Sequence, residues 1–522
     1  MTAENDTKWF AQPGLWLGWA LFLVGQSWLW NQYPNFIGAS DSVHYLLMAE
    51  QLLQGQFWAW LSGHWSPLLS ILLAPLMAAG VDGYQAFKVV NLCCGMGVIA
   101  LLSVQLQALD FPKWWSLLIW PAVVPLLGAM TLLETPDLLL VFLLLAYLRE
   151  FDQCSSANKS LKFCALLAGL VFWSKAIGLY LCLAHFGLWA FRQMVLKRWT
   201  LSQAARKFGQ FFAIMMAVVF LYALPLSLKF ERFTLGTSGQ YNFSLIGTER
   251  QGQQLTRGEL VDPNTKFTRW WAYEEPAEFV QHWSPSATPA DRAHYLQHWR
   301  TNLHRLQYQF WIRDGLILLL LLVGLRLLRP GLWDRLPMDQ LWSWGTIALL
   351  LPLAYSLVII QSRYLWAFAI LVLLIVLTMI RQLRSEGLKL FALVTILILY
   401  TINGLHERQL WVQQPQFFEQ LVEAETAIPA KVLNGKRLAI LDLPKSYYLM
   451  EGNTYLLWTQ RFEFWGQFEL SDFPDKALTE LRNDSIDYFL IWEDRQYGDQ
   501  LFPGTVPIFH DPVVDMAIYP LR

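Results

Sequence analysis

The stretch GASDSVHYLLMAEQLLQG, residues 38–55, follows the first long apolar run of the chain and decides how we interpret the fold. At helical spacing, Asp41, His44 and Gln51 share one face, and leucine-rich positions fill the other. This pattern predicts an amphipathic helix that lies along a membrane surface. Ser40 or Asp41 is expected to cap it, and one explanation of Asp41 is that it does nothing else.

The rest of the chain is strongly apolar. Hydrophobic residues make up 55% of the 522 positions and charged residues 15%, against about 25% charged in an average globular protein. Many apolar runs approach the roughly 20 residues that a helix needs to cross a bilayer. We therefore expect a polytopic α-helical membrane protein. The net charge of −1 gives no reason to expect nucleic acid as a partner.

The apolar runs predict about 11 membrane spans. They lie near residues 14–32, 84–107, 114–132, 137–149, 161–174, 176–191, 208–228, 311–328, 341–360, 364–380 and 388–403. The apolar stretch 66–80 is short and contains prolines, so a re-entrant or interfacial helix is expected there. The five cysteines fall in or beside the spans and indicate neither a disulfide framework nor a zinc site.

Basic residues in the short loops predict the orientation of the spans. One set of loops is rich in lysine and arginine, and the opposite short loops hold almost none besides Lys175 and Arg363. The first set is therefore expected in the cytoplasm, with the N-terminus inside and the C-terminus outside. The loops 33–83 and 229–310 then lie outside, as does the segment 404–522.

The last part of the chain has the pattern of a small α/β domain. RLAILDL at 437–443 and IDYFLIW at 486–492 are typical of buried strands. A helix with an N-cap and a proline in its first turn is expected between them, at 471–484. We therefore divide the chain into a membrane module, 1–403, and an outer α/β domain, 404–522.

Charged residues interrupt apolar sequence at the predicted outer ends of the spans. Glu134 and Asp137 lie in ETPD, Lys175 lies in WSKAIG, and Arg363 lies in QSRYLW. Solvated loop acids, a snorkelling lysine and an interfacial arginine are the simpler explanations. Together with Asp41, however, these residues place acids and cations at one membrane face. Transfer from a lipid phosphate requires such a set, because acids accept a proton and cations stabilise the leaving phosphate.

Histidines add further candidates on the same side. His64 in SGHWSP is expected near the same interface, as a polar loop residue or a substrate contact. His294 and His298 have the i, i+4 spacing of a metal pair. The loop lacks an HExxH motif and is rich in other polar residues, which favours a structural role for this pair.

These segments follow one another in a fixed order. SDSVHYLLMAEQLLQG is followed by HWSPLLSILLAPL, KVVNLCCG, ETPDLLLVFLLLAYL, WSKAIG and SRYLW. This order resembles the GT-C superfamily of glycosyltransferases, over roughly residues 14–380. Within it, the chain looks most like the bacterial protein mannosyltransferases and the aminoarabinose transferase. The resemblance implies a bacterial inner-membrane enzyme, a polyprenyl-phosphate-linked sugar as donor, and a lipid, glycan or protein as acceptor.

The resemblance also implies roles for single residues in an inverting transferase. Asp41 matches the family's first-loop aspartate, which acts at the acceptor as general base or metal-linked orienter. Glu134 or Asp137 matches its second acid, and Lys175 and Arg363 match basic residues that hold the lipid phosphate. The candidates for substrate contacts are His44, His64 and Tyr364.

One departure from the family pattern concerns metal use. Ser42 follows Asp41 where many relatives have a second acid, which weakens a metal-bridging role for this loop. The resemblance leaves a divalent cation, Mg or Mn, open. The alternative function is a flippase or transporter of lipid-linked sugar or polysaccharide, which should show paired charges deep in the spans and an internal repeat. A non-catalytic scaffold would need none of the charged candidates.

Overall fold

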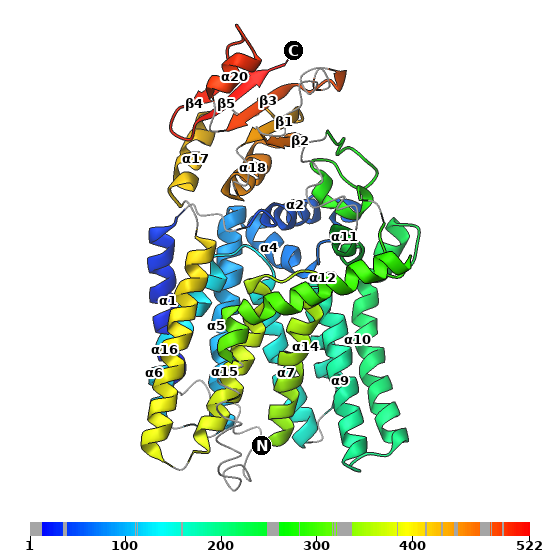
Figure 1. Cartoon of the computed structure of the whole chain (residues 1–522), viewed down its shortest axis with the longest axis vertical. Helices are drawn as coiled ribbons and strands as arrows, with labels where there is room; N and C mark the ends of the chain where they lie inside the picture. The colour runs from blue at the N-terminus through cyan, green and yellow to red at the C-terminus, as the bar shows by residue number, and fades with distance from the viewer. Residues whose placement is uncertain are drawn as a thin grey trace.

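The computed structural model places a helical bundle below a small sheet domain, with a layer of short helices between them (Figure 1). The structure describes residues 13–521 except 35–38, 110, 112, 158–159, 248–259, 281, 316, 318–319, 321–336, 384, 413–414, 430–431, 443–446, 470–480, 482 and 493–494. We call the end of the bundle that faces the sheet domain the domain-facing end.

Long helices form the bundle at the positions of the predicted spans. They are α1 (Pro13–Gln32), α5 (Gly83–Ala108), α6 (Lys113–Thr131), α7 (Asp137–Ala157), α8 (Lys162–Ser174), α9 (Ile177–Val195), α10 (Leu201–Lys229), α14 (Met338–Ser356), α15 (Trp366–Arg381) and α16 (Glu386–Trp411). Most of the predicted span at 311–328 lies outside the described residues. In the described part, four helical stretches are long and apolar enough to cross a membrane by themselves, so the chain is an integral membrane protein. The count of 11 spans stays a prediction.

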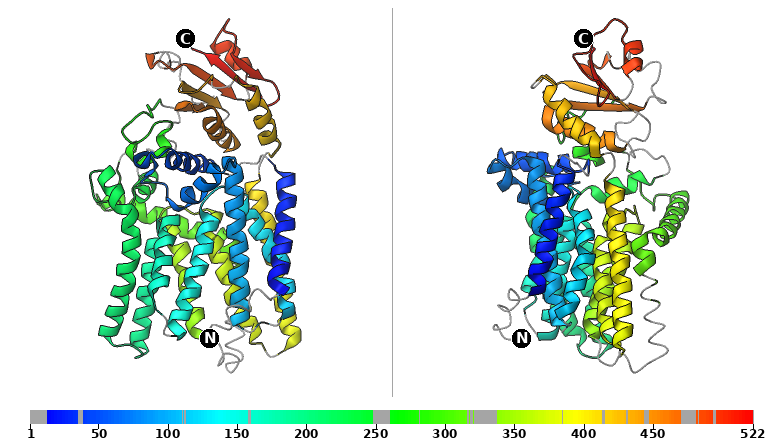
Figure 2. Two further views of the ribbon diagram at one scale, coloured as in Figure 1. Left: turned by 180° about the vertical axis from the view of Figure 1, so that it is seen from behind. Right: turned by 90° about the vertical axis from the view of Figure 1, so that its left-hand side faces the viewer.

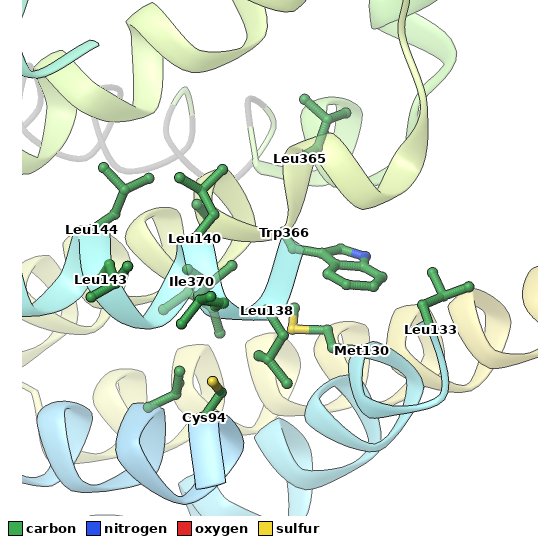
Figure 3. Packing of buried hydrophobic residues seen from close by; sticks show 14 of the residues in the cluster. Cys94, Met130, Leu133, Leu138, Leu140, Leu143, Leu144, Leu365, Trp366 and Ile370 are labelled. Atoms are coloured by element: carbon green, nitrogen blue, oxygen red, sulfur yellow. The ribbon is translucent and has the colours of Figure 1, made fainter. Parts of the chain in front are cut away.

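The centre of the bundle is α15, whose residues from Trp366 to Ile380 are all buried. A helix that is apolar all round is stable only when other helices surround it. Its first turns pack with α7, and Figure 3 shows Trp366 in one apolar cluster with leucines of α7. Close helix packing also needs small residues: a Cβ on Gly404 of α16 would lie 2.7 Å from the backbone nitrogen of Leu126 in α6.

Short helices lie across the domain-facing end, as both views of Figure 2 also show. They are α2 (Ser42–Leu53), α3 (Phe57–Trp60) and α4 (Leu68–Ala78). With 11 residues and Pro75 inside, α4 is too short to cross a bilayer, as the sequence predicts. The prediction of a surface-lying amphipathic α2 is wrong. Residues 42–49 are all buried, because α4 packs on one side of α2 and α18 (Tyr447–Gln460) on another.

The loop 229–310 contains more helix than was predicted from its sequence. It forms α11 (Ser238–Leu245), two 3₁₀ turns, η3 (Ala272–Glu274) and η4 (Pro276–Glu278), and the long α12 (Pro289–Tyr308). The start of α12 has a recognisable helix signal that the prediction omits, since Thr288 caps the helix and proline follows it. His298 and Asn302 bind the end of α14 from this helix.

The sheet domain has five strands in the order β2-β1-β3-β5-β4. They are β1 (Arg437–Asp442), β2 (Glu463–Glu469), β3 (Tyr488–Trp492), β4 (Phe509–Asp511) and β5 (Met516–Pro520), with helices α17 (Pro415–Ala427), α18 and α20 (Arg495–Leu501). β1 runs parallel to β2 and β3, whereas β5 is antiparallel to its neighbours. β1 and β3 lie at the two predicted strands. The predicted helix at 471–484 lies mostly outside the described residues.

Candidate active site

Four charged side chains from distant parts of the sequence meet at the domain-facing end. Asp41 precedes α2, Asp137 begins α7, Lys175 ends α8, and Arg363 lies in the short turn η6 (Ser362–Leu365) before α15. We call these four residues the ionic cluster. All four are among the candidates predicted from the sequence.

Arg363 joins the two acids of the ionic cluster. Its Nη2 lies 3.0 Å from Oδ2 of Asp41, and its Nε lies 3.9 Å from Oδ2 of Asp137. Lys175 completes the cluster, with Nζ 2.5 Å from Oδ1 of Asp137. The Asp137 side chain is 2% exposed, whereas that of Asp41 is 34% exposed. Asp41 is therefore the acid that a ligand can reach.

Local backbone geometry explains why these side chains reach the cluster. Asp41 is helical itself (φ −58°, ψ −25°), and its carboxylate makes no capping hydrogen bond to the described residues of α2. Capping is thus not its role, because a capping residue normally has extended geometry. Lys175 is extended between α8 and α9 (φ −154°, ψ 135°), and this break turns its ammonium towards Asp137.

The pKa values of Asp41 and Lys175 favour their ionised forms. Burial raises the pKa of Asp41, but the charge and hydrogen bond of Arg363 outweigh it, and the pKa is lowered from its ordinary value. Burial lowers the pKa of Lys175, but the charge of Asp137 outweighs it, and the pKa is raised. Both residues are therefore charged at neutral pH, and the formal charges of the four cluster residues sum to zero.

Two tyrosines cover the cations. The rings of Tyr355 and Tyr364 stack with their centroids 4.4 Å apart. Nζ of Lys175 lies 4.3 Å from the centre of the Tyr364 ring, at cation–π distance. Tyr364, a predicted substrate contact, thus lies against the ammonium of Lys175. Tyr355 was not among the candidates, because a tyrosine within an apolar helix carries no signal of its own.

The two candidate histidines form an aromatic stack next to Asp41. The His44 ring lies between Trp65 and Trp271, with centroids 4.5 and 5.3 Å away. His64 packs edge-on against Trp65, 4.6 Å between centroids. Burial disfavours the imidazolium form and lowers the pKa of His44 to about 3 and that of His64 to about 4. Both rings are neutral, and each Nδ1 is buried without a hydrogen-bond partner in the described part of the chain.

Glu134 occupies a different environment. It is 2% exposed, and its electrostatic neighbours include Tyr84 and Lys88 on α5. Asp137 rather than Glu134 therefore supplies the second acid of the ionic cluster.

A buried carboxylate behind the cluster was not predicted from the sequence. Glu407 of α16 is fully buried and accepts hydrogen bonds from the indole nitrogens of Trp311, Trp366 and Trp411, at 3.1, 2.9 and 2.7 Å. The guanidinium of Arg363 lies 6.0 Å from the Trp411 ring, and Trp366 follows η6 directly. Glu407 thus fixes Trp366 and Trp411, the two tryptophans near Arg363.

The carboxylates of the site do not fit a divalent cation. Asp41 and Asp137 are each already bound by a side-chain cation. Within the described residues, no group of three or more histidines, cysteines, aspartates or glutamates is placed to hold a metal ion. His294 and His298 instead contact backbone carbonyls, those of Ile246 and Val358, at 2.8 Å each.

The chain shares its fold with solved structures of another protein. The chain is similar to the crystal structure of ArnT, an aminoarabinose transferase, from Cupriavidus metallidurans bound to undecaprenyl phosphate, with a TM-score of 0.57 and 11% identity over 97% of each chain. The apo structure of the same protein gives a TM-score of 0.54 and 11% identity, covering 99% of this chain and 98% of that one. No family model and no curated protein sequence matches the chain. At this identity the likeness establishes the fold.

Proposed function

We propose that the protein is an inverting glycosyltransferase that moves a sugar from a polyprenyl-phosphate carrier to an acceptor outside the cytoplasm. The observation that carries the proposal is the ionic cluster, which combines a reachable acid with two cations on an ArnT-like fold. That ArnT structure contains undecaprenyl phosphate, the chemical class of carrier that we propose here.

The cations of the cluster suit the phosphate of the donor. Among the described residues, Arg363 makes its contacts through Nε and Nη2, which leaves the donors of Nη1 for a ligand. Lys175 has three N–H donors, and one of them bonds to Asp137. A guanidinium and an ammonium together stabilise the negative charge that develops on a leaving phosphate.

Asp41 suits the acceptor. Its ionised carboxylate accepts a hydrogen bond from the attacking hydroxyl and orients it. A carboxylate with a lowered pKa is a weak base while Arg363 neutralises it. When a donor phosphate shares the guanidinium, the attraction on Asp41 weakens and its pKa rises. Donor binding thus makes Asp41 a better base at the moment when a base is needed.

The reaction then follows a single displacement. The acceptor oxygen forms a bond to the anomeric carbon while the bond from that carbon to the phosphate oxygen breaks. The electron pair leaves with the polyprenyl phosphate, which Arg363 and Lys175 stabilise. The acceptor proton passes to Asp41 and from there to water. Attack from the side opposite the phosphate inverts the configuration.

The position in the cell is part of the proposal. A bacterial inner membrane is proposed from the family resemblance, and the charge asymmetry of the short loops supports an N-terminus in the cytoplasm. The ionic cluster and the segment 404–522 then lie outside, where an acceptor lipid, glycan or protein is available. The division into a membrane module, 1–403, and an outer domain is proposed with it.

The test uses the purified full chain in phospholipid vesicles with a panel of polyprenyl-phosphate-linked sugars. Mass spectrometry measures the release of polyprenyl phosphate by the native chain, by Asp41→Asn and by the matched control Asp262→Asn, an exposed acid outside the cluster. Loss of a general base lowers the rate about 10²–10⁴-fold. We expect that loss for Asp41→Asn alone. Near-normal release by this variant contradicts the base role, and movement of intact donor across the membrane without release indicates a transporter.

A further inference from the structure

A groove of about 790 Å³ lies at the domain-facing end. Its walls come from α2, α3, the end of α10, residues 264–270, Glu274 and two residues of the sheet domain, Asn434 and Arg461. None of the four residues of the ionic cluster is among the described residues that line it. The volume is that of a small-molecule site, and the proposed reaction leaves the groove unused.

The acids of the groove are already satisfied. Glu50 lies 2.7 Å from Nη2 of Arg461. Glu231 lies 2.6 Å from Lys266, and Glu274 accepts backbone N–H bonds from residues 269–271. The negative charge of the lining is therefore compensated within the protein.

Several cationic and polar atoms of the groove have no hydrogen-bond partner among the described residues. Nη1 of Arg461 is buried and has no hydrogen-bond partner among the described residues, and neither has Oε1 of Gln51. Arg269 is exposed and stacks on Trp270, with the guanidinium 4.5 Å from the ring centre, and no described acid pairs with it. Two guanidinium groups of the lining thus carry donors that no described acid accepts. An anionic group of a ligand can accept them.

Aromatic faces line the same space. Trp58 is 55% exposed, and Phe267 and Trp270 are half-buried. The amides of Gln54 and Asn434 stand beside them and can both donate and accept hydrogen bonds. Sugar rings have apolar C–H faces and rims of hydroxyl groups, and they stack on aromatic rings while their hydroxyls bind amides. The groove therefore combines the contacts that a charged sugar needs.

We propose that this groove binds an anionic saccharide portion of the acceptor. The proposal rests on the proposed function and names the substrate class of that site. Along α2, Gln51 lies about 15 Å from Asp41 at 1.5 Å per residue, a span of a few sugar rings. Trp270 lines the groove, and its neighbour Trp271 stacks on His44, one turn from Asp41. The reacting centre therefore lies within the length of a short oligosaccharide from the groove.

The test is a binding titration on the purified full chain, without any donor. Three probes separate the sources of affinity: trigalacturonate is an anionic saccharide, maltotriose is a neutral one, and inorganic phosphate is an anion without sugar. We expect trigalacturonate to bind tightest and to weaken in high salt. Arg269→Gln and Arg461→Gln should each weaken it about tenfold, the cost of one charged hydrogen bond.

Arg437→Gln is the matched control. Arg437 also stacks on a tryptophan, Trp465, at 4.8 Å, but it lies outside the groove. Because Arg269 is exposed, its variant keeps the test valid if Arg461→Gln does not fold. The proposal is overturned if maltotriose or phosphate binds as tightly as trigalacturonate, if Arg437→Gln weakens binding equally, or if no probe binds.

Asp41→Asn separates this inference from the proposed function. It should retain trigalacturonate binding while it loses transfer. Binding that depends on Arg269 in a chain that transfers no sugar supports the groove and rejects the transferase. Normal transfer by Arg269→Gln with no binding of any probe rejects the groove alone.

Discussion

Replacing Glu407 by Gln tests whether the three-tryptophan site holds Arg363 in place. The change keeps the size of the side chain and turns one carboxylate oxygen into an NH₂ group. Oε1 accepts from Trp366 and Trp411, and Oε2 accepts from Trp311. If the amide oxygen takes the place of Oε1, the bonds from Trp366 and Trp411 remain. The NH₂ group then takes the place of Oε2 and faces the N–H of Trp311, and two donors cannot form a hydrogen bond.

The magnitude follows from these contacts. A buried donor left without an acceptor costs about 1–3 kcal/mol. The two remaining bonds change from charge-assisted to neutral, which weakens each by roughly 1 kcal/mol. The amide of the variant is neutral, so the cost of burying a charge disappears, and this offsets about 2 kcal/mol of the losses. We therefore expect a net destabilisation of about 2 kcal/mol, together with a displaced Trp411 and a less well-placed Arg363.

Two measurements distinguish positioning from stability. The thermal midpoint of the purified protein should fall by a few degrees. At a temperature where the variant is folded, KM for the lipid-linked sugar should rise several-fold while the acceptor KM stays unchanged. The matched control is Asp152→Asn, because Asp152 accepts from the buried indole of Trp344 at 3.1 Å, away from the cluster. It should lower the midpoint without changing the donor KM.

A positioning role for Glu407 is refuted if Glu407→Gln leaves the donor KM unchanged in the folded protein. It is also refuted if Asp152→Asn raises the donor KM by the same factor, since that result indicates a general effect of weakened packing. Trp411→Phe provides an independent check, because it removes one indole donor and keeps an aromatic ring beside Arg363.

Three further predictions concern the phosphate, pH and topology. Lys175→Gln and Arg363→Lys should each weaken use of the donor more than use of the acceptor. The first variant removes an ammonium, and in the second an ammonium cannot form the planar guanidinium fork. Unchanged donor kinetics in both contradict the phosphate role. Burial raises the pKa of Glu275 to about 7. The folded protein therefore keeps a proton that the unfolded chain loses near pH 4.5, and the thermal midpoint should fall as pH rises from about 4.5 through 7. Glu275→Gln should flatten this dependence, and an unchanged slope would show that Glu275 does not cause it. Cysteine at Thr265 should react with an impermeant thiol reagent from outside intact cells and cysteine at Lys197 should not, in a chain without Cys93; the reverse labelling inverts the topology.

The members of the ionic cluster could be predicted from the sequence because most of them break an apolar pattern. Lys175 and Arg363 stand out as charges at the ends of apolar runs, and such charges are costly unless they are compensated. Asp41 stands out only by its position after the first span. Its capping role had equal support, and the helical dihedrals and the ion pair with Arg363 were needed to decide the question.

The burial of α2 and the role of Glu407 could not be predicted. Periodicity reports which face of a helix is polar, but it does not report that a distant domain covers that face. The sheet domain supplies α18, which begins at Tyr447, far along the chain from α2. In the same way, Glu407 resembles an ordinary acid at a helix end, and only the fold brings three tryptophans to it.

The neutrality of the ionic cluster has a consequence for the order of binding. Without substrate, each cation is compensated by an acid, so the protein avoids uncompensated charges at the edge of the membrane. In the proposed reaction, a donor phosphate would compete with Asp41 for Arg363, and this exchange would free Asp41 for the acceptor hydroxyl. The donor should therefore bind first, and a non-transferable polyprenyl phosphate should strengthen acceptor binding. In Arg363→Gln the exchange cannot occur, and this strengthening should disappear, as a titration of acceptor with and without polyprenyl phosphate would measure. Acceptor affinity that is independent of the lipid in the native chain would show that Asp41 is not released by the donor.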